Sequence, residues 1–250
     1  MGISTDSKFD YLEPFRETSV RKIYLADYLG SIPYKRALKL QRRLVQARGE
    51  RSIPDVVMML QHPPVLTIGR FRGEDDIIVP REVLAQQGIA VVHTNRGGST
   101  TYHGPGQLVG YPILNLKELC LGVREYIAKL EEVIIRLLLD MGIRGHRVAG
   151  FPGSVWVGDE KICSIGVHVS HYIAMHGFAL NVNTDLRHFE YINPCGIRGK
   201  VMTSISKLLG YSIDVEAIAG VLLDSFSETF ELTQEQGLKR CLAMLDARNG

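Results

Sequence analysis

Cysteine is scarce in this sequence, and so are signals of secretion or membrane insertion. Four cysteines are spread along 250 residues without a CxxC pair, which excludes the disulfide framework typical of small secreted domains. No segment approaches the roughly 20 consecutive apolar residues that a membrane-spanning helix needs. The first residues include several acidic side chains in place of an apolar signal region. We therefore expect a cytoplasmic protein with no membrane partner.

Net charge and cofactor-binding motifs are equally sparse. The formal charge of +2 is too small to indicate a nucleic-acid-binding protein, although it leaves room for a local basic patch. The sequence has neither a Walker loop nor a GxGxxG fingerprint between a strand and a helix. Cys163, His168, His171 and His176 lie close together, but their spacing matches no familiar zinc site. We expect no nucleic-acid partner, no metal and no cofactor.

Composition and periodicity indicate a globular protein with many strands and a few amphipathic helices. Hydrophobic residues make up 45% and charged residues 22% of the chain, close to the globular average. Apolar residues at helical spacing predict helices over Tyr34–Arg48 and Val123–Met141. A short helix opened by Thr203 and a longer helix capped by Asp214 are expected later in the chain. Strands are predicted over Asp55–Leu60, Val65–Ile68, Ile89–His93, Leu108–Leu114, Gly153–Val157, Lys161–Ser170 and Ile173–Asn183.

The order of these elements favours the α+β class. They lack regular βαβ alternation, so we expect one domain built on a mixed, largely antiparallel β-sheet flanked by helices. The domain is expected to span residues 21–232. Residues 1–20 lack periodicity and are expected to form a loose arm, and residues 233–250 a C-terminal tail.

A glycine-rich segment, Arg96–Gln107, combines glycines with polar side chains. Glycine lets backbone N–H groups approach a ligand closely. Arg96 adds a fixed cation, and His103 adds a group that titrates near neutrality. Glycine content alone would also fit a hairpin with a difficult turn. The grouping of Arg, His, Tyr and Gln with the glycines favours a ligand-binding loop instead.

Lys161 stands at the start of an otherwise apolar predicted strand. Alternation with period two places Lys161 on the face shared by Cys163, Ile165, Val167 and Val169. Such a lysine either extends its ammonium group to water or is partly buried, with a lowered pKa, where it can accept a proton or pair with a thiolate. The sequence leaves both interpretations open.

Cys195 lies in the turn Asn193-Pro194-Cys195-Gly196, between polar residues, which argues against an apolar packing role for its thiol. A turn exposes the sulfur atom, and Gly196 leaves its N–H group free to face a developing oxyanion. Cys120 and Cys241 have helical or pre-helical apolar neighbours, and the strand neighbours of Cys163 also favour packing. Cys195 is therefore the candidate nucleophile.

These segments together resemble the lipoyl(octanoyl) transferase family. The family pattern is RGGxxT(F/Y)HxxxQ, KI(C/A)S(I/L)G, HGxALNxN and NPCG. This sequence reads RGGSTTYHGPGQ, KICSIG, HGFALNVN and NPCG in the same order, after HPPVLTIGR upstream. The motifs show no departure from the pattern. The resemblance extends from about residue 55 to about residue 210 and implies the fold of the biotin and lipoate protein ligases.

The resemblance also implies roles for individual residues. Cys195 would carry an acyl thioester, and Lys161 would be its dyad partner. Backbone N–H groups near Gly196, or in the strand Lys161–Gly166, would hold the oxyanion. The walls of the acyl pocket would be Arg96, Gly97, Gly98, Ser99, Thr100, Thr101, Tyr102 and His103, together with Ser164, Ile165, Gly166, Gly177, Phe178 and Ala179.

The implied reaction transfers an octanoyl group to a protein lysine, as in lipoate biosynthesis. The donor would be octanoyl-acyl carrier protein. The acceptors would be lipoyl domains of 2-oxoacid dehydrogenase E2 subunits and the H protein of the glycine-cleavage system. Since carrier proteins of this kind are acidic, the candidate docking cations are Arg70, Arg72, Arg147, Arg198 and Lys200.

Two other functions fit the same fold. An ATP-dependent lipoate or biotin protein ligase would activate a free acid and would need no cysteine, so the NPCG turn and the missing nucleotide loop count against it. A non-catalytic lipoyl-binding module would be expected to lack the Lys161 and Cys195 pair, which this sequence retains.

Overall fold

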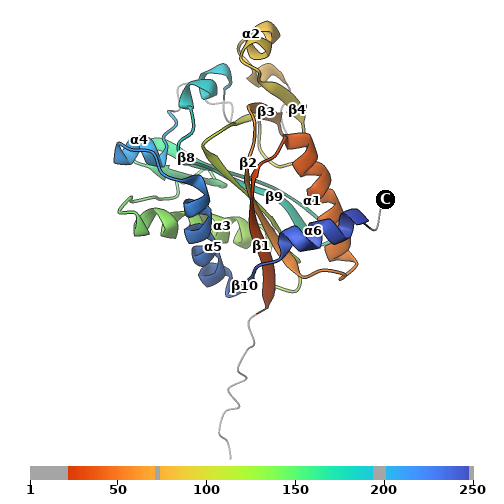
Figure 1. Ribbon diagram of the computed structural model, residues 1–250. Coiled ribbons are helices and arrows are strands. Elements are labelled where there is room, and N and C mark those ends of the chain that lie inside the picture. The colour runs from red at the N-terminus through yellow and green to blue at the C-terminus, as the bar shows by residue number, and fades with distance from the viewer. Residues whose placement is uncertain (1–21, 71–73, 194–200, 248–250) are drawn as a thin grey trace, which may run out of the picture.

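A seven-stranded mixed sheet forms the centre of the computed structural model, which describes residues 22–70, 74–193 and 201–247 (Figure 1). The strand order is β10-β1-β2-β6-β9-β8-β7. β10, β1 and β2 are parallel, whereas β6, β9, β8 and β7 follow in antiparallel pairings. The strands are β1 (Ile23–Ser31), β2 (Asp55–Gln61), β6 (Gln107–Ile113), β7 (Ser154–Val157), β8 (Glu160–Ser170), β9 (Ile173–Asn181) and β10 (Thr233–Glu235). The mixed, largely antiparallel sheet predicted from the sequence is confirmed.

Helices cover both faces of this sheet. On one face lie α3 (Val123–Asp140) and α5 (Val215–Phe230), which pack on each other and on the strands through a large apolar cluster. On the other face lie α1 (Tyr34–Gly49) and α6 (Leu238–Ala247), as Figure 1 shows. The central strands β2 and β9 are therefore buried on both faces, which explains why they read as nearly continuous apolar runs.

A second, smaller sheet of order β4-β3-β5 lies at one end of the large sheet (Figure 1). Its strands are β3 (Val65–Ile68), β4 (Ala90–His93) and β5 (Thr101–His103). A separate apolar cluster joins it to α2 (Arg81–Gln86) and to the 3-10 helix η2 (Leu186–Tyr191), and a shorter 3-10 helix, η1 (Glu74–Asp76), precedes α2. The glycine-rich segment Arg96–Gln107 contains β5 and so contributes one strand to this small sheet.

Helix boundaries largely follow the sequence signals. Asp214 caps α5 as predicted, because its side chain accepts a hydrogen bond from the Glu216 N–H group. The short helix α4 (Ile205–Leu209) is instead capped by Ser204, whose hydroxyl oxygen accepts from the Lys207 N–H group. The prediction that Thr203 opens this helix was therefore wrong by one residue.

The C-terminal segment is part of the fold rather than a separate tail. β10 pairs with β1, and Leu238 of α6 is buried in the apolar cluster under α1. An ion pair between Arg43 and Asp246 joins α6 to α1. The predicted N-terminal arm, residues 1–20, lies outside the described residues. Among the helices of the described chain, none is long and apolar enough to cross a bilayer.

Candidate active site

A cavity of about 130 Å³ lies between the glycine-rich loop, β8, β9 and the start of α1. All the pocket residues that the resemblance implies line it, except Tyr102. The structure thus brings together three segments that are far apart in sequence. They are Arg96, Gly97, Gly98, Ser99, Thr100, Thr101 and His103 from the loop and β5, Ser164, Ile165 and Gly166 from β8, and Gly177, Phe178 and Ala179 from β9.

Tyr102 is placed elsewhere. Thr101 and His103 face the cavity from β5, so alternation along this strand points Tyr102 the opposite way. Its ring is buried in the small apolar cluster and stacks on His188, with the ring centres 4.8 Å apart. The sequence had placed Tyr102 in a loop, where this alternation is not visible. Tyr102 supports the small sheet and does not line the cavity.

Glycines allow the loop to lie directly on the sheet. The Gly97 N–H group donates to the Val167 carbonyl oxygen of β8 at 3.0 Å. A Cβ atom added at Gly166 would stand 2.8 Å from the Gly97 carbonyl oxygen, closer than two such atoms can approach. Side chains at either position would push the loop away from the strand and open the cavity.

Arg96 is a buried cation held by its own hydrogen bonds. Its Nη2 atom donates to the Thr67 carbonyl oxygen at 2.6 Å and to the Thr67 hydroxyl oxygen at 2.8 Å, and Nη1 donates to the Gly97 carbonyl oxygen at 3.0 Å. The guanidinium group is therefore fixed in orientation at the cavity wall. It can shape the loop and add positive potential without moving.

Lys161 faces the cavity because of a β-bulge. Val155 pairs with Cys163, but the next residue of β7, Trp156, pairs with Lys161, so Ile162 is an extra residue in β8. Ile162 and Cys163 both lie in the apolar cluster under α3, whereas Lys161 lines the cavity and is 6% exposed. The prediction that Lys161 shares a face with Cys163 was wrong, and the bulge is the reason.

A chain of buried hydrogen bonds links the glycine-rich loop to Lys161. The His103 Nδ1 atom lies 2.7 Å from the Gln107 Oε1 atom, and the Gln107 amide nitrogen donates to Asn181 Oδ1 at 2.9 Å. The Asn181 amide nitrogen donates to the Thr203 carbonyl oxygen at 3.0 Å, and the Thr203 N–H group donates to the Lys161 carbonyl oxygen at 3.0 Å. Because each partner is buried, these bonds fix the position of Lys161 relative to the loop.

The same chain sets the tautomer of His103. The Gln107 amide nitrogen is a donor, so its oxygen accepts and the His103 Nδ1 atom carries the hydrogen. The Nε2 atom is then an acceptor and faces the Thr67 hydroxyl group at 3.3 Å. Burial, together with the charge of Arg96 and the neighbouring His62, holds the pKa of His103 well below its usual range. His103 is a neutral side chain here.

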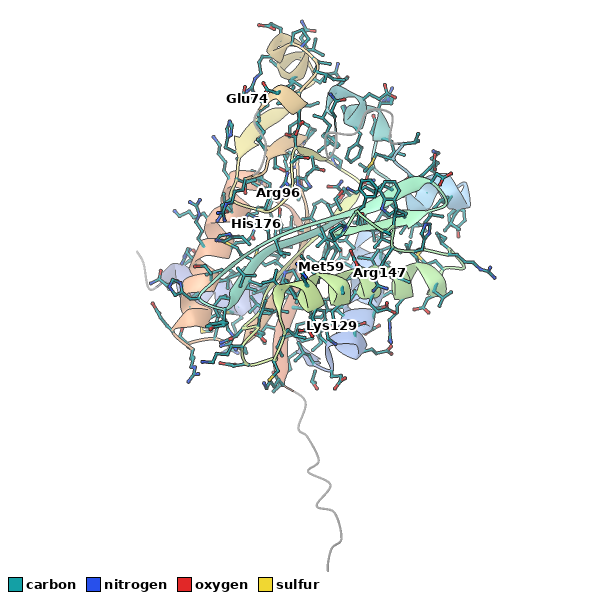
Figure 2. The ribbon with its side chains drawn as sticks, turned by 180° about the vertical axis from the view of Figure 1, so that it is seen from behind. Met59, Glu74, Arg96, Lys129, Arg147 and His176 are labelled. Atoms are coloured by element: carbon teal, nitrogen blue, oxygen red, sulfur yellow. The ribbon has the colours of Figure 1, made fainter. Side chains whose placement is uncertain are left out.

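Two more histidines are buried near His103: His176 lines the cavity, and His62 packs behind its wall against His103 and Tyr111. Burial lowers the pKa of His62 to about 4, and its Nε2 atom lies 2.7 Å from the Tyr111 hydroxyl oxygen. Burial and the positive charge of Arg96 lower the pKa of His176 to about 3. His176 is also strained, because it adopts a φ of 60° inside β9. Figure 2 shows Arg96 and His176 near α1, at the cavity end of the sheet.

Other cavity residues carried no recognisable signal in the sequence. Tyr34 comes from the start of α1 and Tyr111 from β6, both far from the glycine-rich loop. The remaining walls are Phe151, Pro152, Gly153, Ser154, Trp156, His176 and Met202. The exception is His176, which is the first residue of the motif HGFALNVN and could have been chosen from it.

The cysteines fall into different environments. Cys195 and Gly196 lie outside the described residues. Burial raises the pKa of the Cys163 thiol to about 12, which makes it unreactive. Cys241 is buried, as predicted. Cys120 is exposed and has a positive φ of 55° at the end of a turn, so the predicted packing role for it was wrong. Within the described part of the chain, no group of three or more potential metal ligands is present.

The structure also bears on the expected oxyanion donors in β8 and on the expected docking cations. The N–H groups of Lys161 and Ile165 already donate to the carbonyl oxygens of Val201 and Gly153, so neither is available to an oxyanion. Arg147 forms ion pairs with Glu131 and Glu132 at 2.9 and 2.8 Å, which weakens the case for it as a docking cation. Arg70 is exposed, and Arg72, Arg198 and Lys200 lie outside the described residues.

Comparison with known proteins decides the family. A family model described as the lipoyl protein ligase A/B catalytic domain matches residues 33–227. That span contains the cavity, Lys161 and every strand from β2 to β9. The chain belongs to the lipoyl protein ligase A/B family.

Named relatives indicate the activity of this family member, and a solved structure shares its fold. The octanoyltransferase of Desulforamulus reducens is 42% identical over 215 residues, which cover 86% of this chain and 93% of the relative. The octanoyltransferase of Alkaliphilus metalliredigens is 45% identical over 203 residues, covering 81% and 93%. The protein is therefore an acyltransferase of this family. A bi-partite lipoate protein ligase from Thermoplasma acidophilum shares the fold with a TM-score of 0.68 at 16% identity, over 90% of this chain and 92% of that chain.

Proposed function

We propose that the protein transfers an octanoyl group from octanoyl-acyl carrier protein to a lysine of lipoyl domains, through a thioester on Cys195. The observation that carries this proposal is the cavity, which joins Lys161 to an apolar wall containing Ile165, Phe178 and Ala179. Relatives that cover most of the chain are octanoyltransferases. The acceptors would be lipoyl domains of 2-oxoacid dehydrogenase E2 subunits and the glycine-cleavage H protein.

The place of Cys195 in the chain supports its role. It lies two residues after Asn193 and six before Val201. The Asn193 N–H group is bound to the Asp76 carbonyl oxygen at 2.7 Å, and the Val201 carbonyl oxygen accepts the N–H group of Lys161 at 3.1 Å. Val201, six residues after Cys195, is therefore hydrogen-bonded directly to Lys161.

The reaction would proceed in two acyl transfers. The Cys195 thiolate attacks the carbonyl carbon of the donor thioester, and the carrier thiol leaves and takes up a proton. The substrate lysine then attacks the new thioester with its neutral amine. The amide forms, the carbon–sulfur bond breaks, and the proton lost by the amine is taken up by the departing sulfur, which restores the Cys195 thiol. Lys161 would either accept the thiol proton or stabilise the thiolate by its charge. Neither step needs a nucleotide, because the donor is already activated.

The acyl chain would bind by burial against the apolar wall. Each buried methylene group contributes roughly 0.8 kcal/mol, so a seven-carbon tail offers about 5 kcal/mol of binding free energy. A ligase on the same fold would use this wall too, but it would have to activate a free acid with ATP. The donor requirement therefore separates the two functions.

The test is transfer to a purified lipoyl domain, followed by the mass of that domain. With octanoyl-acyl carrier protein and no ATP, we expect one octanoyl group per domain, and we expect Lys161→Met to slow the transfer. Transfer from free octanoate that depends on ATP, with none from the carrier protein, would instead establish a ligase.

A further inference from the structure

Helix α1 carries a concentrated positive charge. Five lysines and arginines fall within nine residues, at positions 35, 36, 39, 42 and 43, and the helix contains no acidic residue. The whole chain has a formal charge of only +2. This helix therefore makes its own local patch on a protein that is nearly neutral overall.

Helical geometry turns most of these charges outward. Lys35, Lys39 and Arg42 are spaced i, i+4 and i+7, which places them in one row along the helix. These three and Arg36 are exposed. The opposite side of α1 is buried against the sheet through Tyr34, Ala37, Leu38, Gln41 and Leu44. We call this set of exposed cations the α1 basic face; it consists of Lys35, Arg36, Lys39 and Arg42.

These charges have no carboxylate partners within the described chain. Arg43, at the edge of the patch, pairs with Asp246 of α6, but none of the four residues of the α1 basic face forms an ion pair with another described residue. By contrast, Arg136 and Lys207 each pair with a glutamate. Figure 2 shows Arg147, which is also paired, beside α3 on the other face of the sheet.

Helix stability does not account for the position of the charges. The N-terminal turn of a helix is its positive end, so cations there are unfavourable and acidic residues are favoured. α1 has Lys35 and Arg36 in that turn and no acidic residue. The unfavourable placement suggests that these side chains interact with something outside the chain.

The α1 basic face starts at the cavity. Tyr34, which directly precedes Lys35, lines the cavity. Gln41, between Lys39 and Arg42, accepts the N–H group of His176 at 2.8 Å through its Oε1 atom, and His176 is a cavity residue. A molecule bound along α1 would therefore lie beside the cavity that takes the acyl group in the proposed function.

We propose that the α1 basic face docks the acidic surface of the acyl carrier protein that donates the octanoyl group. This inference rests on the proposed octanoyl transfer. A carrier protein holds its acyl group on a long flexible arm, so its docking surface can extend along the helix, at about 1.5 Å per residue from Tyr34. An acceptor lysine has a short side chain, and its domain must approach the cavity itself. The geometry of α1 therefore fits the donor better than the acceptor.

The experiment compares two double charge reversals. Lys35→Glu/Lys39→Glu changes the α1 basic face. The control, Arg124→Glu/Arg144→Glu, changes exposed cations at the start of α3 and in the loop after it, and alters the net charge by the same amount. Glutamate at position 35 is favourable at a helix N-terminus, so the test variant should unfold at the wild-type temperature or above. Loss of function through misfolding would be visible as a lower melting temperature.

Steady-state transfer is measured with octanoyl-acyl carrier protein and with a small octanoyl thioester, at low and high salt. We expect the test variant to raise KM for the carrier protein roughly tenfold and to lose its salt dependence. KM for the small thioester and all values for the control variant should stay at wild-type levels. An unchanged KM for the carrier protein would overturn the docking proposal. A raised KM for the lipoyl domain alone would assign α1 to the acceptor and overturn it equally.

The two proposals fail in different ways. If the wild type transferred octanoyl groups from neither donor, the proposed function would be wrong, whatever the charge of α1. If the wild type used both donors and the α1 variant used both equally well, only the docking surface would be wrong.

Discussion

Acid should destabilise this protein well above the pH at which most carboxylates titrate. Three histidines, His62, His103 and His176, are buried around the cavity, and burial lowers the pKa of each one. A histidine with a lowered pKa in the folded state is neutral there but binds a proton when the chain unfolds. Their contribution to stability is therefore complete above pH 6.5 and is lost as the pH falls toward the folded-state values.

The size of the effect follows from these pKa values. The ordinary pKa is 6.5, and the folded values are about 4 for His62 and about 3 for His176. At pH 5 both rings remain neutral in the folded protein. Each then costs about 1.4 kcal/mol per pH unit below 6.5, which is about 2 kcal/mol at pH 5. His62 and His176 together should lower the free energy of unfolding by about 4 kcal/mol at pH 5. The lowered pKa of His103 acts in the same direction. Burial raises the pKa of Asp55, which works in the opposite direction.

Urea unfolding at pH 7, 6 and 5 measures this loss directly. In His62→Gln, the difference between pH 7 and pH 5 should be smaller than in the wild type by about 2 kcal/mol. The control His146→Gln replaces an exposed histidine and should keep the wild-type difference. A wild-type difference below about 2 kcal/mol would refute the reasoning, since it would mean that the buried rings are protonated in the folded protein.

Two substitutions test the contacts around the cavity. Gly166→Ala should slow octanoyl transfer roughly tenfold or more, because its Cβ atom would stand 2.8 Å from the Gly97 carbonyl oxygen. The matched control is Gly220→Ala in α5, where an added Cβ atom has no neighbour within 4 Å, and this variant should stay fully active. Equal activity of the two variants would contradict the close contact between Gly166 and the loop. Asn181→Leu should lower the free energy of unfolding by about 3 kcal/mol in urea titrations, because it leaves two buried hydrogen-bonding groups unsatisfied. A decrease in the free energy of unfolding of less than about 1 kcal/mol would show that the series of buried hydrogen bonds leading to Lys161 does not stabilise the fold.

Much of the fold could be predicted from local patterns. β2 and β9 are buried on both faces and therefore read as apolar runs, and α3 shows a complete apolar stripe. β1 was not predicted, because its sequence IYLADYLGS mixes polar and apolar residues and five of its positions are only half buried. β10 and α6 were set apart as a tail, because their place beside β1 and α1 depends on pairing across the whole chain.

The cavity was predicted in part, for a comparable reason. Motifs located the glycine-rich loop and the strand segments that line the cavity. The direction of Lys161 depends on the bulge at Ile162, which is defined by pairing with β7 and not by the sequence of β8. Tyr34 and Tyr111 reach the cavity from α1 and β6, so only the folded chain shows that they belong to it.

The central claim is that an octanoyl group rests on Cys195 during transfer. The most direct test is the intact mass of the protein after mixing with octanoyl-acyl carrier protein, without ATP and without an acceptor, beside a Cys195→Ser variant. We predict one octanoyl group on the wild type that hydroxylamine removes, and none on the variant. No adduct on the wild type, or the same adduct on the variant, would contradict the proposed thioester on Cys195.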